Sequence, residues 1–203
     1  MKLICIGRNY AEHARELNNP LPAKPVFFMK PDTALLPPHN PFFLPDFSND
    51  IHYEVELVLR VCKHGRSIAE QFAHKYYDAI GVGIDFTARD LQAECKQKGL
   101  PWEVAKAFDF SAPVSRFLPK EQFADLSNIN FGLKINDVWR QQGNSKDMIF
   151  SFDQIIAYVS QFVTLREGDY IFTGTPEGVG PTHIDDRFEL FIEDQMLLAF
   201  NVK

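Results

Sequence analysis

The stretch HYEVELVLRV, residues 52–61, decides the fold, because apolar and polar side chains alternate along it. Its odd positions are all apolar, beginning with Tyr53 and Val55, and its even positions include Glu54 and Glu56. Alternation with a period of two is typical of a β-strand that buries one face. We therefore predict a strand whose two glutamates project from the same face.

Strand patterns continue on both sides of this stretch. Further strands are predicted over residues 2–7, 77–86, 128–137, 168–174, 187–193 and 196–202. Helices are predicted over residues 11–17, 87–99 and 151–163. The second helix should begin at the N-cap Thr87 and end at Gly99, and the third should begin at the N-cap Ser151. Because strands dominate, we predict an α+β, mainly β fold built on a β-roll or barrel with a few helices, and residues 1–203 in one domain.

The composition excludes several classes of protein. The chain has 203 residues, of which 45% are apolar, as is ordinary for a globular protein with a sizeable core. Its net charge is −6 and no basic stripe is visible, so we expect no nucleic-acid partner. No apolar run approaches the roughly 18 residues of a membrane span, and the N-terminal one is too short for a signal peptide. Three cysteines without CxxC spacing indicate a reduced compartment, so we expect a cytoplasmic protein.

A third carboxylate, Asp85, closes the apolar strand that contains Gly81 and Gly83. Glycines inside a strand often mark the close approach of a ligand or of another backbone. If Asp85 converges with Glu54 and Glu56, the three charges repel one another unless a cation neutralises them. Oxygen ligands without Cys or His favour Mg²⁺, Mn²⁺ or Ca²⁺ over zinc. For the two glutamates alone, the alternative is an ordinary solvated strand face.

Two further groups have the residue types of an active site. His13 and Glu16 lie three residues apart on the first predicted helix, so they can share a face. A histidine polarised by a carboxylate is a competent base near neutral pH, and the alternative is a surface ion pair. Lys106 lies among apolar residues in WEVAKAFDF, where it either faces an anionic ligand or extends to the surface.

Six short motifs occur in the same order as in the fumarylacetoacetate hydrolase family. They are GRNYAEHARE at 7–16, KP at 30–31, HYEVEL at 52–57, GIDFTARD at 83–90, AKAFD at 105–109 and GTPEGVG at 174–180. Over nearly its whole length the chain resembles the short, single-domain members of that family, the acylpyruvate hydrolase and oxaloacetate decarboxylase group. The resemblance implies the family's distorted β-roll, a homodimer, and Glu54, Glu56 and Asp85 as ligands of Mg²⁺ or Mn²⁺.

The resemblance also implies roles for residues outside the metal site. His13 and Glu16 match the dyad that activates water in this family. Gln92, Lys106 and Thr175 match positions around the substrate, and Lys106 is expected to be catalytic as well.

The implied reaction is cleavage of a carbon–carbon bond in a small 2-oxo acid. A metal that binds the 1-carboxylate and 2-oxo oxygens can stabilise the enolate that forms when the next bond breaks. Hydrolysis of an acylpyruvate and decarboxylation of oxaloacetate both yield such an enolate. The alternatives are an isomerase or decarboxylase of aromatic-degradation intermediates on the same fold, and a metal-stabilised binding protein without turnover.

Overall fold

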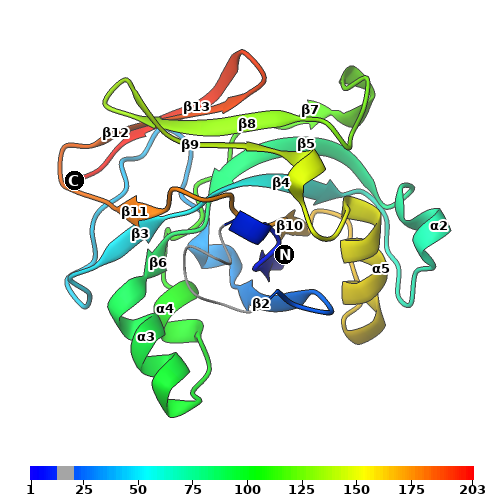
Figure 1. Cartoon of the computed structure of the whole chain (residues 1–203), viewed down its shortest axis with the longest axis horizontal. Helices are drawn as coiled ribbons and strands as arrows, with labels where there is room; N and C mark the ends of the chain where they lie inside the picture. The colour runs from blue at the N-terminus through cyan, green and yellow to red at the C-terminus, as the bar shows by residue number, and fades with distance from the viewer. Residues whose placement is uncertain (13–20) are drawn as a thin grey trace.

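The structure is a computed structural model that describes residues 1–12 and 21–203 (Figure 1). In it, the alternating stretch of residues 52–61 forms two strands rather than the single strand predicted. These strands are β3 (Ile51–Tyr53) and β4 (Val55–Val61), and they belong to different sheets. Only Glu54 separates them, and its carbonyl accepts a hydrogen bond of 2.8 Å from the Asp85 N–H. The change of sheet therefore places the Glu54 side chain at the junction, beside the end of the next strand.

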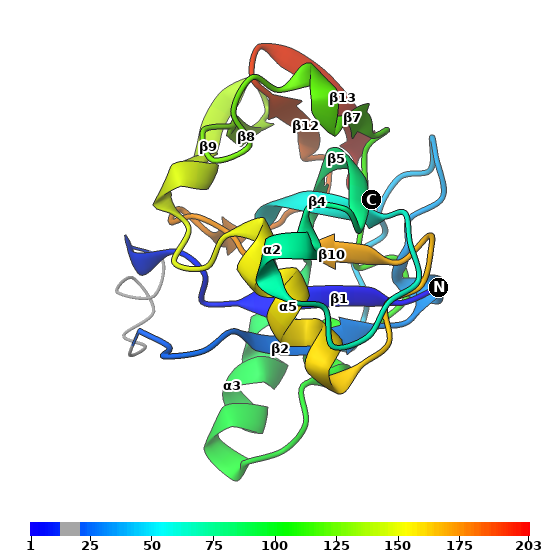
Figure 2. The same ribbon diagram turned by 90° about the vertical axis from the view of Figure 1, so that its right-hand side faces the viewer.

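Three open sheets make up the β part of the described chain (Figures 1 and 2). The six-stranded sheet has the order β2 (Val26–Lys30), β1 (Leu3–Gly7), β10 (Tyr170–Phe172), β4, β5 (Tyr77–Ile84) and β7 (Leu118–Pro119). The three-stranded sheet has the order β11 (Gly180–Pro181), β3 and β6 (Thr87–Ala88). The four-stranded sheet has the order β13 (Gln195–Asn201), β12 (Arg187–Ile192), β8 (Asn130–Ile135) and β9 (Val138–Asn144). The mainly β, α+β class is confirmed, and none of these three sheets closes into a barrel.

All but one of the strand pairs in these sheets are antiparallel. The exception is β1, which runs parallel to β10 and pairs Leu3 with Tyr170. The first strand of the chain thus lies inside the largest sheet, between β2 and a strand from near the C-terminus (Figure 2).

Four α-helices and three short 3₁₀-helices accompany the sheets in the described residues. The α-helices are α2 (Glu70–Ala73), α3 (Arg89–Lys98), α4 (Glu103–Lys106) and α5 (Phe152–Phe162). The 3₁₀-helices are η1 (Asp32–Ala34), η2 (Lys120–Gln122) and η3 (Ser145–Asp147). No α-helix among them has the length and apolar character that crossing a membrane requires.

The helix ends confirm two of the three predicted signals. Ser151 caps α5 through a capping box with Gln154, and Gly99 ends α3 in the left-handed conformation with a φ of 65°. The prediction for Thr87 was wrong, because the N-cap of α3 is Ala88 and Thr87 lies in β6. The Thr87 hydroxyl instead accepts a hydrogen bond of 2.5 Å from the Lys106 ammonium. The helix predicted over residues 11–17 falls largely outside the described residues.

The sequence pattern did not predict β9. Asn136 and Asp137 both have positive φ values, 52° and 64°, and form the tight turn that leads from β8 into this strand. Asn and Asp tolerate that conformation better than most residues. The strand itself, VWRQQGN, is mostly exposed and lacks regular alternation, which is why it gave no signal.

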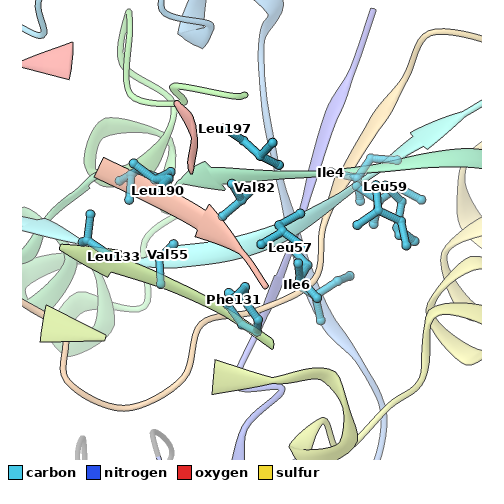
Figure 3. Close-up of a cluster of buried hydrophobic side chains, with 14 of the residues drawn as sticks. Ile4, Ile6, Val55, Leu57, Leu59, Val82, Phe131, Leu133, Leu190 and Leu197 are labelled. Atoms are coloured by element: carbon cyan, nitrogen blue, oxygen red, sulfur yellow. The ribbon is translucent and has the colours of Figure 1, made fainter. Parts of the chain in front are cut away.

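The core lies between the four-stranded sheet and the strands β4 and β5. Figure 3 shows part of it, with labelled side chains from β1, β4, β5, β8, β12 and β13 in one cluster. The odd-numbered residues of β4 point into this cluster, whereas Val58 packs on the opposite face with Cys5 and Phe172. Glu56 shares the face of Val58, so the alternation directs it away from the larger core.

Candidate metal centre and active site

Three carboxylates from neighbouring strands converge. Glu54, Glu56 and Asp85 each place one oxygen within 4.8 Å of the other two. The pairing of Glu56 with Gly83 in the β4–β5 ladder fixes their register. The side chains are buried, with exposed fractions of 6%, 1% and 1%, so the solvated strand face is ruled out.

The glycine beside this cluster serves the backbone rather than a ligand. A Cβ atom on Gly83 would lie 2.8 Å from the carbonyl oxygen of Pro113, which is too close. Of the two expected causes of an in-strand glycine, a ligand or another backbone, the structure shows the second. The absence of a side chain at Gly83 allows the segment around Pro113 to pack against β5.

Two cationic side chains hold Glu54 by both of its oxygens. The Lys106 ammonium donates hydrogen bonds to Glu54 Oε2 at 2.8 Å and to Asp85 Oδ2 at 2.7 Å. The Arg89 guanidinium donates to Glu54 Oε1 at 2.6 Å. Lys106 is itself buried, so the sequence alternative of a lysine that extends to the surface is wrong.

A second buried lysine, Lys30, lies 2.8 Å from Asp85 Oδ1. Its three N–H groups are already donated, to the carbonyl oxygens of Phe86 and Ser111 and to the Ser111 hydroxyl. The contact with Asp85 is therefore ionic, and Asp85 Oδ1 is buried without a hydrogen-bond donor. An anionic oxygen in this state is a suitable ligand for a cation.

Burial and mutual repulsion shift the pKa values of the cluster. Burial, followed by the charges of Asp85 and Glu54, raises the pKa of Glu56 well above its usual range, although the Gly174 N–H donates to Glu56 Oε2 at 2.7 Å. Burial lowers the pKa of Lys106, but Asp85 and Glu54 outweigh it and the net pKa is raised. Lys106 is therefore a cation at neutral pH and acts as a charge and a donor.

These observations fit a divalent cation. Three buried carboxylates are close enough to share one ion, one of their oxygens has no donor, and Glu56 is held in a repulsive field that a cation would relieve. All three offer hard oxygen ligands. Glu54, Glu56 and Asp85 thus form a site for a divalent metal.

The three carboxylates line a small pocket of about 40 Å³. The side chains and backbone that line it are Ile6, Gly7, Arg8, Phe28, Glu54, Glu56, Asp85, Arg89, Gln92, Lys96, Trp102, Lys106 and Thr175. The structure therefore brings Gln92, Lys106 and Thr175, all predicted from the sequence, to the three carboxylates.

A sequence model described as the fumarylacetoacetate (FAA) hydrolase C-terminal domain matches residues 2–201. The chain belongs to the fumarylacetoacetate hydrolase family. It is 44% identical to bovine oxaloacetate tautomerase FAHD1, a mitochondrial protein, over 99% of this chain and 91% of that one. It is 43% identical to the mitochondrial oxaloacetate decarboxylase of Dictyostelium discoideum over 89% and 83%.

A solved structure gives the same relationship. The fumarylpyruvate hydrolase of Pseudomonas aeruginosa, crystallised with Mn²⁺ and pyruvate, superposes with a TM-score of 0.93. It is 36% identical, and the match covers all of this chain and 89% of that one. This chain is thus an enzyme of the fumarylacetoacetate hydrolase family with a buried acidic metal site.

Two of the residues predicted to bind substrate, Gln92 and Thr175, accept hydrogen bonds from other side chains of the protein. Gln92 is buried on α3, and its carbonyl oxygen accepts a hydrogen bond of 2.7 Å from Arg89. Thr175 is buried in the glycine-rich loop formed by GTPEGVG, residues 174–180, and its hydroxyl accepts a hydrogen bond of 2.9 Å from Gln141. The predicted dyad, His13 and Glu16, lies outside the described residues.

Three residues that hold the side chains of this site in place were not predicted. Lys30 and Arg89 occur in the quoted KP and GIDFTARD motifs, but their sequence distance from Glu54 and Asp85 hid the ion pairs. Gln141 gave no signal, since it lies in the polar run of β9. Its amide accepts from the Val55 N–H and donates to Thr175 and to the Pro176 carbonyl, each at 2.9 Å. It ties the start of β4 to the glycine-rich loop.

Proposed function

We propose that this chain is a divalent-metal-dependent enzyme that acts on oxaloacetate and related small 2-oxo acids. Its primary reaction is the interconversion of the keto and enol forms of oxaloacetate, and decarboxylation is a second outcome at the same site. The buried carboxylate triad in a pocket lined by cations supports this proposal. The names of the bovine and Dictyostelium relatives support the choice of oxaloacetate.

A divalent cation at this site would supply Lewis-acid stabilisation to the enolate of a 2-oxo acid. Lys106 and Arg89 hold Glu54 in place through both of its oxygens. Their positive charges also attract an anionic substrate into a pocket that otherwise contains three carboxylates. Trp102 and Phe28, whose ring centres lie 5.9 Å apart, line the pocket with apolar surface that limits the access of water.

The two oxaloacetate reactions differ in what leaves C3. In tautomerisation a proton leaves C3, the double bond moves from C2=O to C2=C3, and a proton is added to the 2-oxo oxygen, so no bond between heavy atoms is broken. In decarboxylation the C3–C4 bond breaks, its electron pair stays with C3, and CO₂ departs. Both pass through an enolate, which is why one site can support either.

A second candidate function is hydrolysis of acylpyruvates, which the structural match to the Pseudomonas fumarylpyruvate hydrolase favours. This reaction needs a water that attacks the distal carbonyl carbon before the C3–C4 bond breaks. We propose His13, oriented by Glu16, as the base that takes the proton from this water.

The deciding experiment is an initial-rate assay on oxaloacetate, acetylpyruvate and fumarylpyruvate with Mg²⁺ and with Mn²⁺, following the enol absorbance. We expect oxaloacetate turnover that EDTA abolishes and that either metal restores. Glu56→Ala, which removes a carboxylate of the triad, should be inactive while still folded by circular dichroism. Full activity of a demetallated sample would refute the proposal.

A further inference from the structure

The pocket carries more positive charge than the metal site uses. Four cationic side chains line the pocket, namely Arg8, Arg89, Lys96 and Lys106. Lys106 and Arg89 are already paired with carboxylates. Arg8 and Lys96 form no salt bridge within the part of the chain that the structure describes.

Lys96 lines the pocket from α3. It follows Gln92 by four residues, so the two side chains lie on the same face of the helix. Its ammonium lies 5.6 Å from the centre of the Trp102 ring, which also lines the pocket. Lys96 is otherwise exposed, so a ligand can reach it from solvent.

Arg8, which directly follows β1, lines the same pocket. Its backbone is left-handed, with a φ of 60°, a conformation that costs energy for an arginine and often marks a functional position. Burial lowers the pKa of Lys96, and the nearby positive charges of Arg89 and Arg8, which repel its ammonium, lower it further. A bound anion would relieve this repulsion.

We propose that Arg8 and Lys96 form a second anion subsite that binds the distal carboxylate of a dicarboxylic 2-oxo acid. The subsite makes the enzyme selective for substrates with a carboxylate at each end over monocarboxylates of the same length. This inference rests on the proposed function, because it assumes that the 2-oxo acid end of the substrate lies at the metal site.

The test compares two acids of four carbons that differ only at the distal end. Oxaloacetate has a carboxylate there, and 2-oxobutyrate has a methyl group. For each variant, one initial-rate experiment with Mn²⁺ gives the KM for oxaloacetate and the Ki of 2-oxobutyrate as a competitor. The variants are Lys96→Gln, Arg8→Gln and Arg8→Lys, with Lys98→Gln as the matched control, since Lys98 is exposed on the same helix and pairs with Glu94.

We expect Lys96→Gln and Arg8→Gln each to raise the KM for oxaloacetate by roughly tenfold or more, as loss of a charged hydrogen bond does. The Ki of 2-oxobutyrate should stay within about twofold of the wild type, because the methyl group makes no charged contact. Arg8→Lys should recover most of the loss, and Lys98→Gln should match the wild type.

Equal changes in KM and Ki, or no change in either, would overturn the subsite. Lys96→Gln decides this even if Arg8→Gln fails to fold, because Lys96 is exposed on a helix. A wild type that neither turns over oxaloacetate nor binds 2-oxobutyrate would instead refute the proposed function, and the subsite with it.

Discussion

At the scale of single residues, the site is a balance of buried charges. Lys106 is the central cation, because it contacts Glu54, Asp85 and Thr87 at once. Removing one partner of a buried ion pair leaves the other charge without compensation, which costs more than the pair itself contributes.

Lys106→Met should therefore destabilise the metal-free protein by about 3–5 kcal/mol. Urea unfolding in EDTA measures this loss, with the exposed Lys98→Met as the control. Saturating Mn²⁺ should reduce the difference, because the ion replaces part of the lost positive charge. Equal stability of the two variants in EDTA would show that the Lys106 pairs contribute nothing.

The proposed base can be tested independently of the metal. His13→Ala should lower acylpyruvate hydrolysis by roughly 10²–10⁴-fold, the usual effect of losing a general base. Mn²⁺ affinity should hardly change, because His13 is not a proposed ligand, and oxaloacetate decarboxylation should fall less than hydrolysis. Hydrolysis at the wild-type rate would favour a surface ion pair between His13 and Glu16.

A histidine beside the site should make stability depend on pH. Burial, followed by the charge of Arg89, lowers the pKa of His52 below its ordinary 6.5, although Asp50 opposes the shift. The folded protein then binds this proton less readily than the unfolded chain does. The stability that neutral His52 contributes is thus present above 6.5 and is lost as the pH falls through the lowered pKa.

We therefore expect the wild type to lose more free energy of unfolding between about pH 7.5 and about pH 5 than His52→Gln does. Urea titrations at both pH values measure the difference. His64→Gln, at an exposed histidine, should behave as the wild type. If His52→Gln also loses as much as the wild type, His52 is not the cause of the acid sensitivity.

The three carboxylates were predictable from the sequence, because Glu54 and Glu56 stand two residues apart in an alternating strand and Asp85 follows the end of an apolar strand. It could not find Lys30 or Arg89 as their partners, because a contact between distant residues depends on the sheet order. Strand spacing gives a direction to each side chain, but only the pairing of β4 with β5 brings Glu56 beside Asp85.

At the scale of elements, the break between β3 and β4 is decisive. The alternation of residues 52–61 predicted the strand but not the change of sheet at Glu54, because both halves have the same pattern. Helix α5 was predictable from local signals, since its cap and its apolar face are both encoded within the helix. Strand β9 was not predictable, because it depends on pairing with β8 rather than on a pattern in its own sequence.

Gln141 on β9 links two of these elements, so its loss should affect both stability and activity. Gln141→Met leaves the Val55 N–H and the Thr175 hydroxyl without their partner, which should cost about 1–3 kcal/mol. Turnover of oxaloacetate should fall because Thr175 is no longer held. Gln142→Met, at the exposed neighbour, is the matched control for urea unfolding and for initial rates, and equal behaviour of the two would contradict this positioning role.

At the scale of the whole molecule, the expected homodimer stays a prediction. Apolar side chains are exposed on the four-stranded sheet, including Trp139, whose ring lies 5.2 Å from that of Phe191. Light scattering should give twice the 23.3 kDa of one chain across the micromolar range. A mass of one chain would contradict it. The cytoplasmic location and the single domain also stay predictions.

The parallel pairing of β1 with β10 has a consequence for how the chain is made. Lys2 and Asp169, next to these strands, are 167 residues apart and form an ion pair. During synthesis the first strand leaves the ribosome long before its partner does, and its inner edge stays open until then. Pairing over such a distance closes a very long loop, which slows folding. The largest sheet can be completed only after β10 has been made, so the nascent chain must keep an apolar first strand from pairing wrongly in the meantime.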